Sequence, residues 1–310
     1  MSGTFIKHHA AGCPGHPRLE AAGLRWLAEA TGAGGVRVAG VLAVGDRSLE
    51  LERITLAAPA AGAGEALGRA LAVTHAAGAP WHGAPPPGWT GLGGIGRAPL
   101  PFAPDPGGPG RWGEFYARFR VLPYVRAAIR NGALPAASAA VFQKLAERLE
   151  AGDFDSPQPG LAGPVARLHG DLWAGNVLWT APPWPETDAG GGPGANRGWT
   201  GATLIDPAAH GGHAETDLAM LALFGIPQLE QVIDGYRSVS PMAPGWRRRV
   251  GLHQIHPLLV HAVLFGPSYG ERATQRAREF ADGNGAAGAR GWRAQRAGSA
   301  GPGKSASFGT

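Results

Sequence analysis

The apolar and polar positions near the N-terminus predict a small β-rich unit around one helix. Thr4–His9 has the pattern of a short strand, and Leu19–Thr31 has the apolar spacing of an amphipathic helix. Two further β-rich runs, Val36–Val44 and Ser48–Ile54, are joined by a turn at Gly45-Asp46. The order strand, helix, strand, strand is that of a small mixed lobe.

The rest of the chain is dominated by helical periodicity. Helical spacing occurs at Gly64–Ala77, Trp112–Asn131, Ala137–Ala151, Ala214–Phe224, Leu229–Tyr236, Leu252–Phe265 and Tyr269–Ala281. A Pro/Gly-rich loop is predicted at Gly78–Gly110. Two short strands, Asn176–Trp179 and Thr203–Ile205, enclose a Gly/Pro-rich insertion. Helices therefore supply most of the expected core.

These patterns divide the 310 residues into three regions. We predict a small N-terminal lobe at 1–56, a helical lobe at 57–281 and a disordered low-complexity tail at 282–310. The 51 glycines and 28 prolines concentrate in recognisable loops, so their excess is compatible with a folded core. The predicted fold class is α+β, with two lobes.

Composition narrows the cellular setting. Cys13 is the only cysteine, which excludes a disulfide framework and fits a reducing cytoplasm. No apolar leader follows Met1, and no apolar run reaches membrane-spanning length. The net charge is +5, and four of the basic residues lie in the predicted tail: Arg290, Arg293, Arg296 and Lys304. We expect a cytoplasmic protein with no nucleic-acid or membrane partner.

The strongest chemical signal is HGDLWAGNVLW at His169–Trp179, read together with LIDP at Leu204–Pro207. Phosphoryl transfer from ATP needs a base for the attacking hydroxyl and oxygen ligands for Mg²⁺. Asp171 lies in a loop after an apolar segment and is the predicted catalytic base. Asn176 and Asp206 are the predicted Mg²⁺ ligands. A carboxylate, an amide and a second carboxylate in this order favour an ATP-dependent phosphotransferase.

Three residues of the small lobe are candidates for ATP binding. Lys7 ends the first predicted strand, and Glu20 lies near the start of the first predicted helix. A lysine held by a helix glutamate can bind the α- and β-phosphates of ATP. Glu52 lies in Glu50–Ile54, at the end of the β-rich part, where backbone groups of a two-lobed kinase meet the adenine.

Other matches to known motifs lack the context that their chemistry requires. GLGGIG at Gly91–Gly96 follows Pro85–Pro87 instead of a strand, which excludes a dinucleotide site. GSAGPGKS at Gly298–Ser305 has no following helix and is a chance match to the P-loop pattern. His210-x-x-His213 and His253-x-x-His256 have zinc-compatible spacing but no evident third ligand, which favours packing or solvent exposure.

The sequence resembles the fructosamine kinase (ketosamine-3-kinase) family, which has the aminoglycoside-phosphotransferase-like, protein-kinase-like fold. The resemblance rests on 169–179 with its Trp173, on IDPAAHGGHAETDLAMLALFG at 205–225, on WGEFYARFRVLPYVRAA at 112–128 and on LHQIHPLLVHAVLFGPSYG at 252–270. Trp173 stands where many antibiotic and choline phosphotransferases carry other residues. We expect the resemblance to extend over most of the chain from Phe5 to Ala281.

The resemblance implies phosphorylation of a sugar-derived ketoamine hydroxyl with ATP and Mg²⁺, as a deglycation step on a small ketosamine or a glycated protein. It implies Asp171 as the base, Asn176 and Asp206 as metal ligands, and Lys7 with Glu20 at the phosphates. Asp217 matches an acidic family position that supports the site structurally. A monomer is expected.

The sequence departs from the family pattern at its start. The family has two more strands and a glycine-rich turn before the lysine strand, whereas only six residues precede Lys7 here. We therefore expect either an upstream start or an incomplete small lobe without the glycine-rich hairpin. Two alternatives stay open: a kinase of the same fold acting on an aminoglycoside, choline or a similar hydroxyl, and an inactive remnant that binds a nucleotide.

Overall fold

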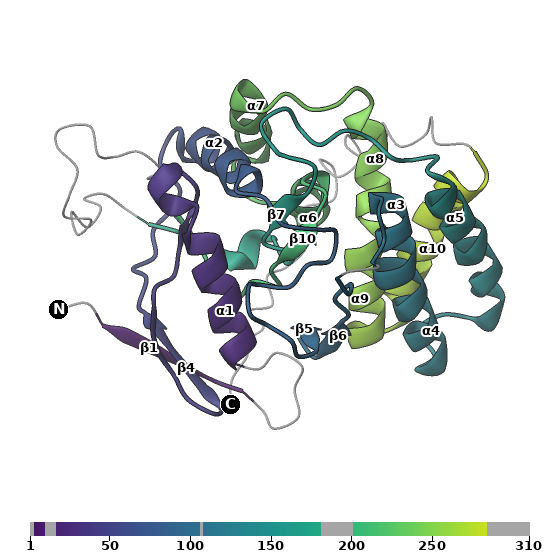
Figure 1. Ribbon diagram of the computed structural model, residues 1–310, viewed down its shortest axis with the longest axis horizontal. Helices are drawn as coiled ribbons and strands as arrows, with labels where there is room; N and C mark the ends of the chain where they lie inside the picture. Colours follow the sequence, from purple (N-terminus) through teal and green to yellow (C-terminus); the bar gives the residue numbers. More distant parts are fainter. Residues whose placement is uncertain (1–2, 10–16, 106–107, 181–200, 284–310) are drawn as a thin grey trace.

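The chain folds into a small strand-rich part at its N-terminal end and a larger, mostly helical part (Figure 1). The computed structural model describes residues 3–9, 17–105, 108–180 and 201–283. The Gly/Pro-rich insertion and nearly all of the predicted tail, including the P-loop-like match, lie outside these residues. The division into a strand-rich and a helical part confirms the predicted α+β class.

Three antiparallel strands and one helix form the N-terminal part. They are β1 (Thr4–His8), α1 (Pro17–Ala28), β3 (Val41–Val44) and β4 (Ser48–Glu52), with the strands in the order β1-β4-β3. Leu49 and Leu51 alternate with polar residues along β4 and are buried with Leu24 and Leu27 of α1. The side-chain period of two thus turns one face of the sheet toward the helix.

The prediction of one continuous strand at Val36–Val44 was wrong, because this segment forms two strands in different sheets. β2 (Arg37–Val38) runs parallel to β9 (Ala202–Leu204), whereas β3 pairs with β4. The Ala39 N–H donates to the Leu204 carbonyl, and the next residue, Gly40, accepts from the Glu52 N–H. Ala39 and Gly40 therefore form hydrogen bonds with two different sheets. An apolar run in the sequence does not reveal such a division.

The helical part contains helices interspersed with short strands. They are α2 (Ala63–Ala76), β5 (Gly93–Ile95), β6 (Ala98–Leu100), α3 (Trp112–Phe115), α4 (Leu122–Arg130), α5 (Ala139–Ala151), β7 (Ala166–Leu168), β8 (Val177–Trp179), β9, β10 (His210–Gly212), α6 (Glu215–Phe224), α7 (Leu229–Val239), α8 (Trp246–His253), α9 (Ile255–Phe265) and α10 (Pro267–Ala281). A π-helical segment, Tyr116–Val121, joins α3 to α4. β7 pairs with β10, and β8 pairs with β9.

Two further expectations for the helical part are corrected. The predicted loop Gly78–Gly110 contains the β5–β6 hairpin. The predicted helix Leu252–Phe265 is two helices, which meet at Gln254. Pro257 has no N–H to donate to the His253 carbonyl four residues earlier, and this carbonyl accepts from the Tyr116 hydroxyl at 3.2 Å instead.

Helices α2 and α7 lie so close together that glycine is required where they touch. A Cβ on Gly68 would lie 1.9 Å from the Val232 carbonyl oxygen, and a Cβ on Gly235 would lie 2.0 Å from the Glu65 carbonyl oxygen. This close approach brings His75 of α2 within hydrogen-bonding distance of Tyr236 on α7. His75 also contacts Asp217 of α6, so these two helices are linked to the candidate active site.

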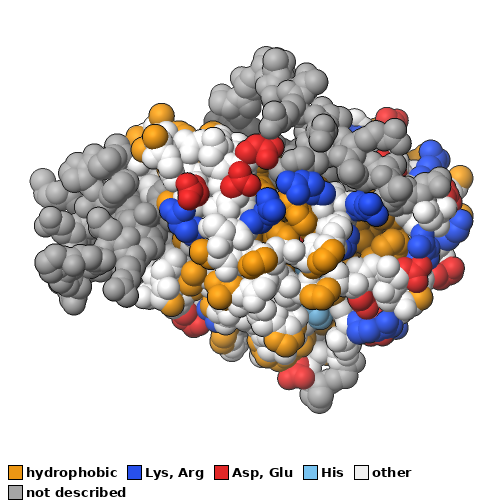
Figure 2. Space-filling model, turned by 90° about the horizontal axis from the view of Figure 1, so that it is seen from above, with side chains coloured by type: hydrophobic (Ala, Val, Ile, Leu, Met, Phe, Trp, Pro, Cys, Tyr) orange, Lys and Arg blue, Asp and Glu red, His pale blue; other side chains and the backbone are white. Residues whose placement is uncertain are grey.

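The surface shows no large uniform patch in the view of Figure 2, where basic, acidic and apolar side chains are interspersed. None of the helices in the described ranges has the length and apolar character needed to cross a membrane.

The buried imidazole of His82 is expected to make folding stability depend on pH. Burial lowers the pKa of His82 to about 4, against an opposing attraction from Asp155. Its stabilising contribution is therefore complete above the unfolded-state pKa of about 6.5 and is lost as the pH falls toward 4. In urea denaturation, the unfolding free energy of the wild type should fall as the pH is lowered from about 6 to 4.5. His82→Gln should make this dependence on pH shallower by roughly 1 kcal/mol per pH unit. A slope equal to that of the wild type would contradict this.

Candidate active site

The segment from His169 to Asn176 forms a tight loop between β7 and β8, and we call it the catalytic loop because it carries the predicted base. Gly170 has φ +81°, and a Cβ there would lie 2.1 Å from the Ala208 carbonyl oxygen, so this turn requires glycine. A short 3₁₀ turn, Ala174–Asn176, then returns the chain toward Asp171. The Asn176 amide donates to the Asp171 backbone oxygen at 2.8 Å and to its Oδ2 at 3.1 Å. The loop thus holds the predicted base and one predicted metal ligand together.

Asp206 follows β9 and lies beside this loop. The Ile205 N–H donates to the Asn176 carbonyl at 3.1 Å, and the Ile205 carbonyl lies 2.9 Å from Nε2 of His169. Asp206 itself has φ +53°, a left-handed conformation that is strained for a residue with a side chain. Strain of this kind persists only where the surroundings impose it, and it concentrates at functional sites.

Lys7 connects the small part of the molecule to this group. On β1 it is opposite Leu49, so its side chain lies on the face that α1 covers. Its Nζ is 2.8 Å from Oε2 of Glu20 and 3.0 Å from Oδ1 of Asp206. The predicted lysine–glutamate pair is therefore present, and the lysine also reaches the carboxylate that follows β9.

Burial and mutual charge control the ionisation of these groups. Burial lowers the pKa of Lys7, but the carboxylates of Glu20 and Asp206 more than offset this and raise it. Burial raises the pKa of Asp171 to about 7, reinforced by Asp206 and Asp217 and opposed by the Asn176 hydrogen bond. A carboxyl with a pKa near neutrality is well matched to proton transfer at physiological pH.

Glu52, the sixth predicted site residue, takes a different position. It is opposite Thr4 in the β1–β4 register, and strand alternation places its side chain on the other face from Lys7. Its carboxylate is 2.7 Å from the Arg37 guanidinium, which also donates to the Thr203 hydroxyl at 2.9 Å. Through Arg37, the Glu52 carboxylate links β4 to β2 and β9. A role at the adenine for the backbone of Glu50–Ile54 stays a prediction.

A buried carboxylate that the residue patterns alone did not single out supports the catalytic loop. Asp217, on α6, accepts from the N–H groups of His169 at 2.7 Å and Gly170 at 3.0 Å. Its Oδ2 is also 3.2 Å from Nε2 of His75, whose Nδ1 is 3.0 Å from the Tyr236 hydroxyl. These bonds outweigh burial and lower the pKa of Asp217, so an ionised group holds the loop backbone. The family resemblance pointed to this supporting role.

Among the described residues, one cluster has metal-compatible ligand types, and sequence spacing did not reveal it. His213, Glu215 and His253 are buried, with ligand atoms within 4.8 Å of one another. The Glu215 carboxylate, however, accepts two hydrogen bonds from Arg249, at 2.8 and 2.5 Å. A guanidinium in contact with the carboxylate already neutralises it and repels a second cation. Of the two expected roles, packing and solvent exposure, the burial of His213 and His253 fits packing.

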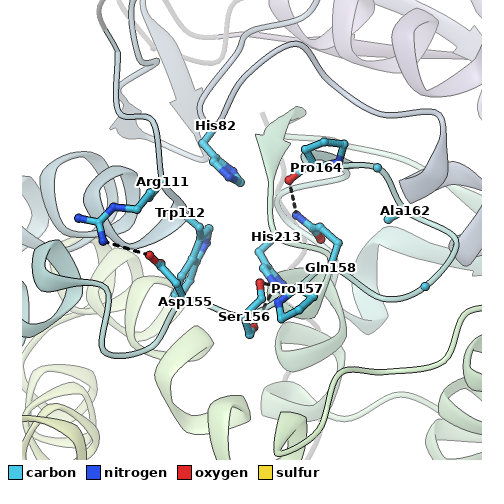
Figure 3. Close-up of a pocket in the computed structure, with 12 residues that line it drawn as sticks. His82, Arg111, Trp112, Asp155, Ser156, Pro157, Gln158, Ala162, Pro164 and His213 are labelled. Atoms are coloured by element: carbon cyan, nitrogen blue, oxygen red, sulfur yellow. Dashed lines mark hydrogen bonds and ion pairs between the residues drawn. The ribbon is translucent and has the colours of Figure 1, made fainter.

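Figure 3 shows a cavity of about 620 Å³ whose lining includes Pro164 and His213. Pro164 precedes β7, so the cavity lies near the opposite end of this strand from the catalytic loop. None of the six predicted site residues lines it. Asp155 on its wall accepts from the Gly113 N–H and contacts Arg111, and Gln158 joins the backbone of Gly212 and Ala214. These polar groups serve the fold, and the candidate active site is the cluster around Asp171.

The residues of this cluster fit a Mg²⁺ ion. Asn176 uses its amide nitrogen on Asp171, so that within the described residues its amide oxygen has no hydrogen-bond donor. Asp206 is 40% exposed and uses one oxygen on Lys7. Carboxylate and amide oxygens are the hard ligands that Mg²⁺ prefers.

The family model for fructosamine kinase matches residues 2–281. The chain belongs to the fructosamine kinase family. This match confirms the resemblance that the sequence motifs indicated.

Relatives in this family resemble the chain in sequence and structure. The solved structure of a Thermobifida fusca protein, named "putative fructosamine-3-kinase", is 41% identical with a TM-score of 0.71, covering 89% of this chain and 85% of that one. A "probable ketoamine kinase" of Synechocystis sp. is 32% identical over 69% of this chain, and one of Enterococcus faecium is 36% identical over 36%. The matching segments span 60% and 34% of these two curated relatives.

Substitutions in the network behind the loop should differ sharply in their cost. Asp217→Asn replaces one acceptor oxygen by an NH₂ group that faces an N–H donor, and we expect a loss of about 3–5 kcal/mol in unfolding free energy. Tyr236→Phe removes only the hydroxyl that meets His75, and about 1 kcal/mol should be lost. Chemical denaturation of both variants measures this difference, and equal losses would contradict the central role of Asp217.

Proposed function

We propose that this protein transfers the γ-phosphoryl group of ATP to a hydroxyl of a ketosamine. The observation that carries the proposal is that three separate segments of the sequence meet at one place, bringing together Lys7, the Asp171–Asn176 pair and Asp206. Family membership supports the ketosamine as acceptor. A positioned base, a phosphate-binding cation and two oxygen ligands are the parts that phosphoryl transfer requires.

In the proposed reaction, the acceptor hydroxyl oxygen forms a bond to the γ-phosphorus. The bond from this phosphorus to the β–γ bridging oxygen breaks, and ADP leaves with that electron pair. Asp171 accepts the hydroxyl proton, and Asn176 holds its carboxylate in place. Lys7, oriented by Glu20, offers its ammonium to the phosphates. Asn176 and Asp206 would hold Mg²⁺, which neutralises phosphate charge when bound.

The proposal extends to the setting of the reaction. The acceptor is a small ketosamine or a glycated side chain of a protein, and its phosphorylation serves deglycation. The single Cys13 supports a cytoplasmic location. The runner-up acceptors, aminoglycosides and choline, belong in the same substrate panel, and turnover of these alone would replace the ketosamine in the proposal.

The first test is turnover with Mg-ATP and a fructosamine, measured as ADP and phosphorylated product. Asp171→Asn should lower kcat by about 10²–10⁴-fold, because general-base catalysis contributes that much. Binding of a non-hydrolysable ATP analogue should persist. Asp234→Asn, an exposed carboxylate on α7, is the control and should retain full activity. Nucleotide binding without turnover by the wild type would favour the inactive remnant instead.

Lys7 should act mainly on the nucleotide. Lys7→Met removes a charged hydrogen bond to phosphate, so the KM for ATP should rise by about 10- to 100-fold. The KM for the fructosamine should change far less. Steady-state kinetics with each substrate varied in turn separates the two effects. A rise in both KM values by the same factor would assign Lys7 to the fold of the small part instead.

A further inference from the structure

The chain carries nearly all of its positive charge on arginine. Of its 28 basic residues, only three are lysines: Lys7, Lys144 and Lys304. An aldose sugar forms a ketosamine with an amine that has lost its proton, whereas a guanidinium stays protonated. Few side chains of this protein can therefore acquire the modification on which the proposed function acts.

The two lysines within the described residues have opposite surroundings. The Lys7 side chain is 29% exposed, and its Nζ contacts the carboxylates of Glu20 and Asp206. Burial lowers the pKa of Lys7, but these carboxylates more than offset this and raise it, so the amine stays protonated and is a poor nucleophile. The Lys144 side chain is 57% exposed and contacts the carboxylate of Asp282. Lys144 is thus the more accessible of the two amines.

The helix α5 presents Lys144 to solvent. Its buried residues Phe142, Leu145, Ala146 and Leu149 form one face, with the spacing of an amphipathic helix. At 100° per residue, Lys144 lies on the opposite face. A sugar can therefore approach its amine without any rearrangement of the core.

The end of α10 holds a carboxylate beside this amine. Nζ of Lys144 lies 3.0 Å from Oδ1 of Asp282. One turn further along α5, Arg148 donates to the Phe280 carbonyl, and the Asp282 N–H donates to the Arg278 carbonyl. Backbone anchors therefore keep Asp282 next to Lys144, where an exposed ion pair alone would hold it only weakly.

We propose that Lys144 is the preferred glycation site among the lysines of this chain, and that a second copy of the chain phosphorylates the ketosamine formed there. The second part rests on the proposed function, which includes a glycated side chain of a protein as acceptor. Figure 1 shows α5, which carries Lys144, and β1, which carries Lys7, at opposite ends of the molecule. Because Lys7 belongs to the candidate active site, the ketosamine on Lys144 reaches such a site only in another molecule.

The Asp282 carboxylate supplies the base that ketosamine formation needs. The lone pair of the neutral Lys144 amine forms a bond to C1 of the open-chain aldose, and water leaves to give an iminium ion. Asp282 then removes the proton from C2, only two bonds from Nζ, and the electron pair of that bond neutralises the iminium. The proton returns to C1 while the C2 hydroxyl loses its own proton to solvent, which leaves a ketone at C2.

The first test measures where ketosamine forms. The protein is incubated with glucose without ATP, and peptide mass spectrometry follows each lysine. Ketosamine should form faster at Lys144 than at Lys7, and Asp282→Asn should slow its formation at Lys144 by about threefold or more, because the general base is lost. Lys304 is the internal reference, since no aspartate or glutamate follows Asp282 in the sequence, and its rate should not change. Equal rates at Lys144 and Lys7, or no effect of Asp282→Asn, would overturn the inference.

The second test measures phosphorylation between two copies. Glycated Asp171→Asn protein, which lacks the proposed base, is the acceptor, and unglycated wild type with Mg-ATP is the enzyme. Phosphate should appear on the Lys144 ketosamine in proportion to the wild-type concentration, and none should appear without wild type. The matched control acceptor also carries Lys144→Arg, which keeps a positive charge beside Asp282 but offers no amine. It should lose most of the phosphate.

Two outcomes separate this inference from the proposed function. If wild type phosphorylates the free fructosamine of lysine but leaves glycated Lys144 unmodified, the role of the second copy is overturned and the proposed function stands. If wild type phosphorylates neither acceptor, the proposed function falls, and the role of the second copy falls with it. The preference for Lys144 is decided by the glucose incubation alone, which involves no phosphoryl transfer.

Discussion

The candidate site depends on one buried carboxylate, that of Asp217. Two consecutive backbone N–H groups, of His169 and Gly170, donate to its two oxygens, and His75 contacts it from behind. An unpaired carboxylate in the interior would be very unfavourable, so the loss of any of these partners leaves the Asp217 carboxylate with an incompletely compensated desolvation cost. The loop therefore has little freedom to move without breaking several bonds together. These bonds also restrict the position of Asp171, because it directly follows Gly170.

The two parts of the molecule meet through charges around the same loop. Lys7 of β1 contacts Asp206, and Arg37 of β2 contacts both Glu52 and Thr203. The parallel pairing of β2 with β9 adds backbone hydrogen bonds between the small part and the strand that precedes Asp206. These contacts link Lys7, the proposed phosphate-binding residue, to the segment that carries Asp206, a proposed metal ligand. A displacement of the small part would move Lys7 and change the surroundings of Asp206 at once.

Much of the fold and site could be predicted because the signals were local. The amphipathic spacing of α1, α2 and α5 follows from which residues must face a core, and the HGD-x4-N pattern encodes a loop whose turn requires Gly170. The features that the sequence patterns did not predict arise from contacts between residues far apart in the sequence. The division between β2 and β3 arises from hydrogen bonds to residues far along the chain, and the clustering of Glu215 with His213, His253 and Arg249 depends on how α6 meets α8.

The sequence by itself indicated the chemistry proposed here: the candidate base, the two candidate oxygen ligands, the lysine–glutamate pair and the family to which the chain belongs. Only the tertiary structure decided how these groups ionise and what supports them. Burial raises the pKa of Asp171 to about 7, and the Glu52 carboxylate is engaged by Arg37 on the face away from Lys7. Solvent exclusion and long-range contact are properties of packing, and residue order does not encode them locally.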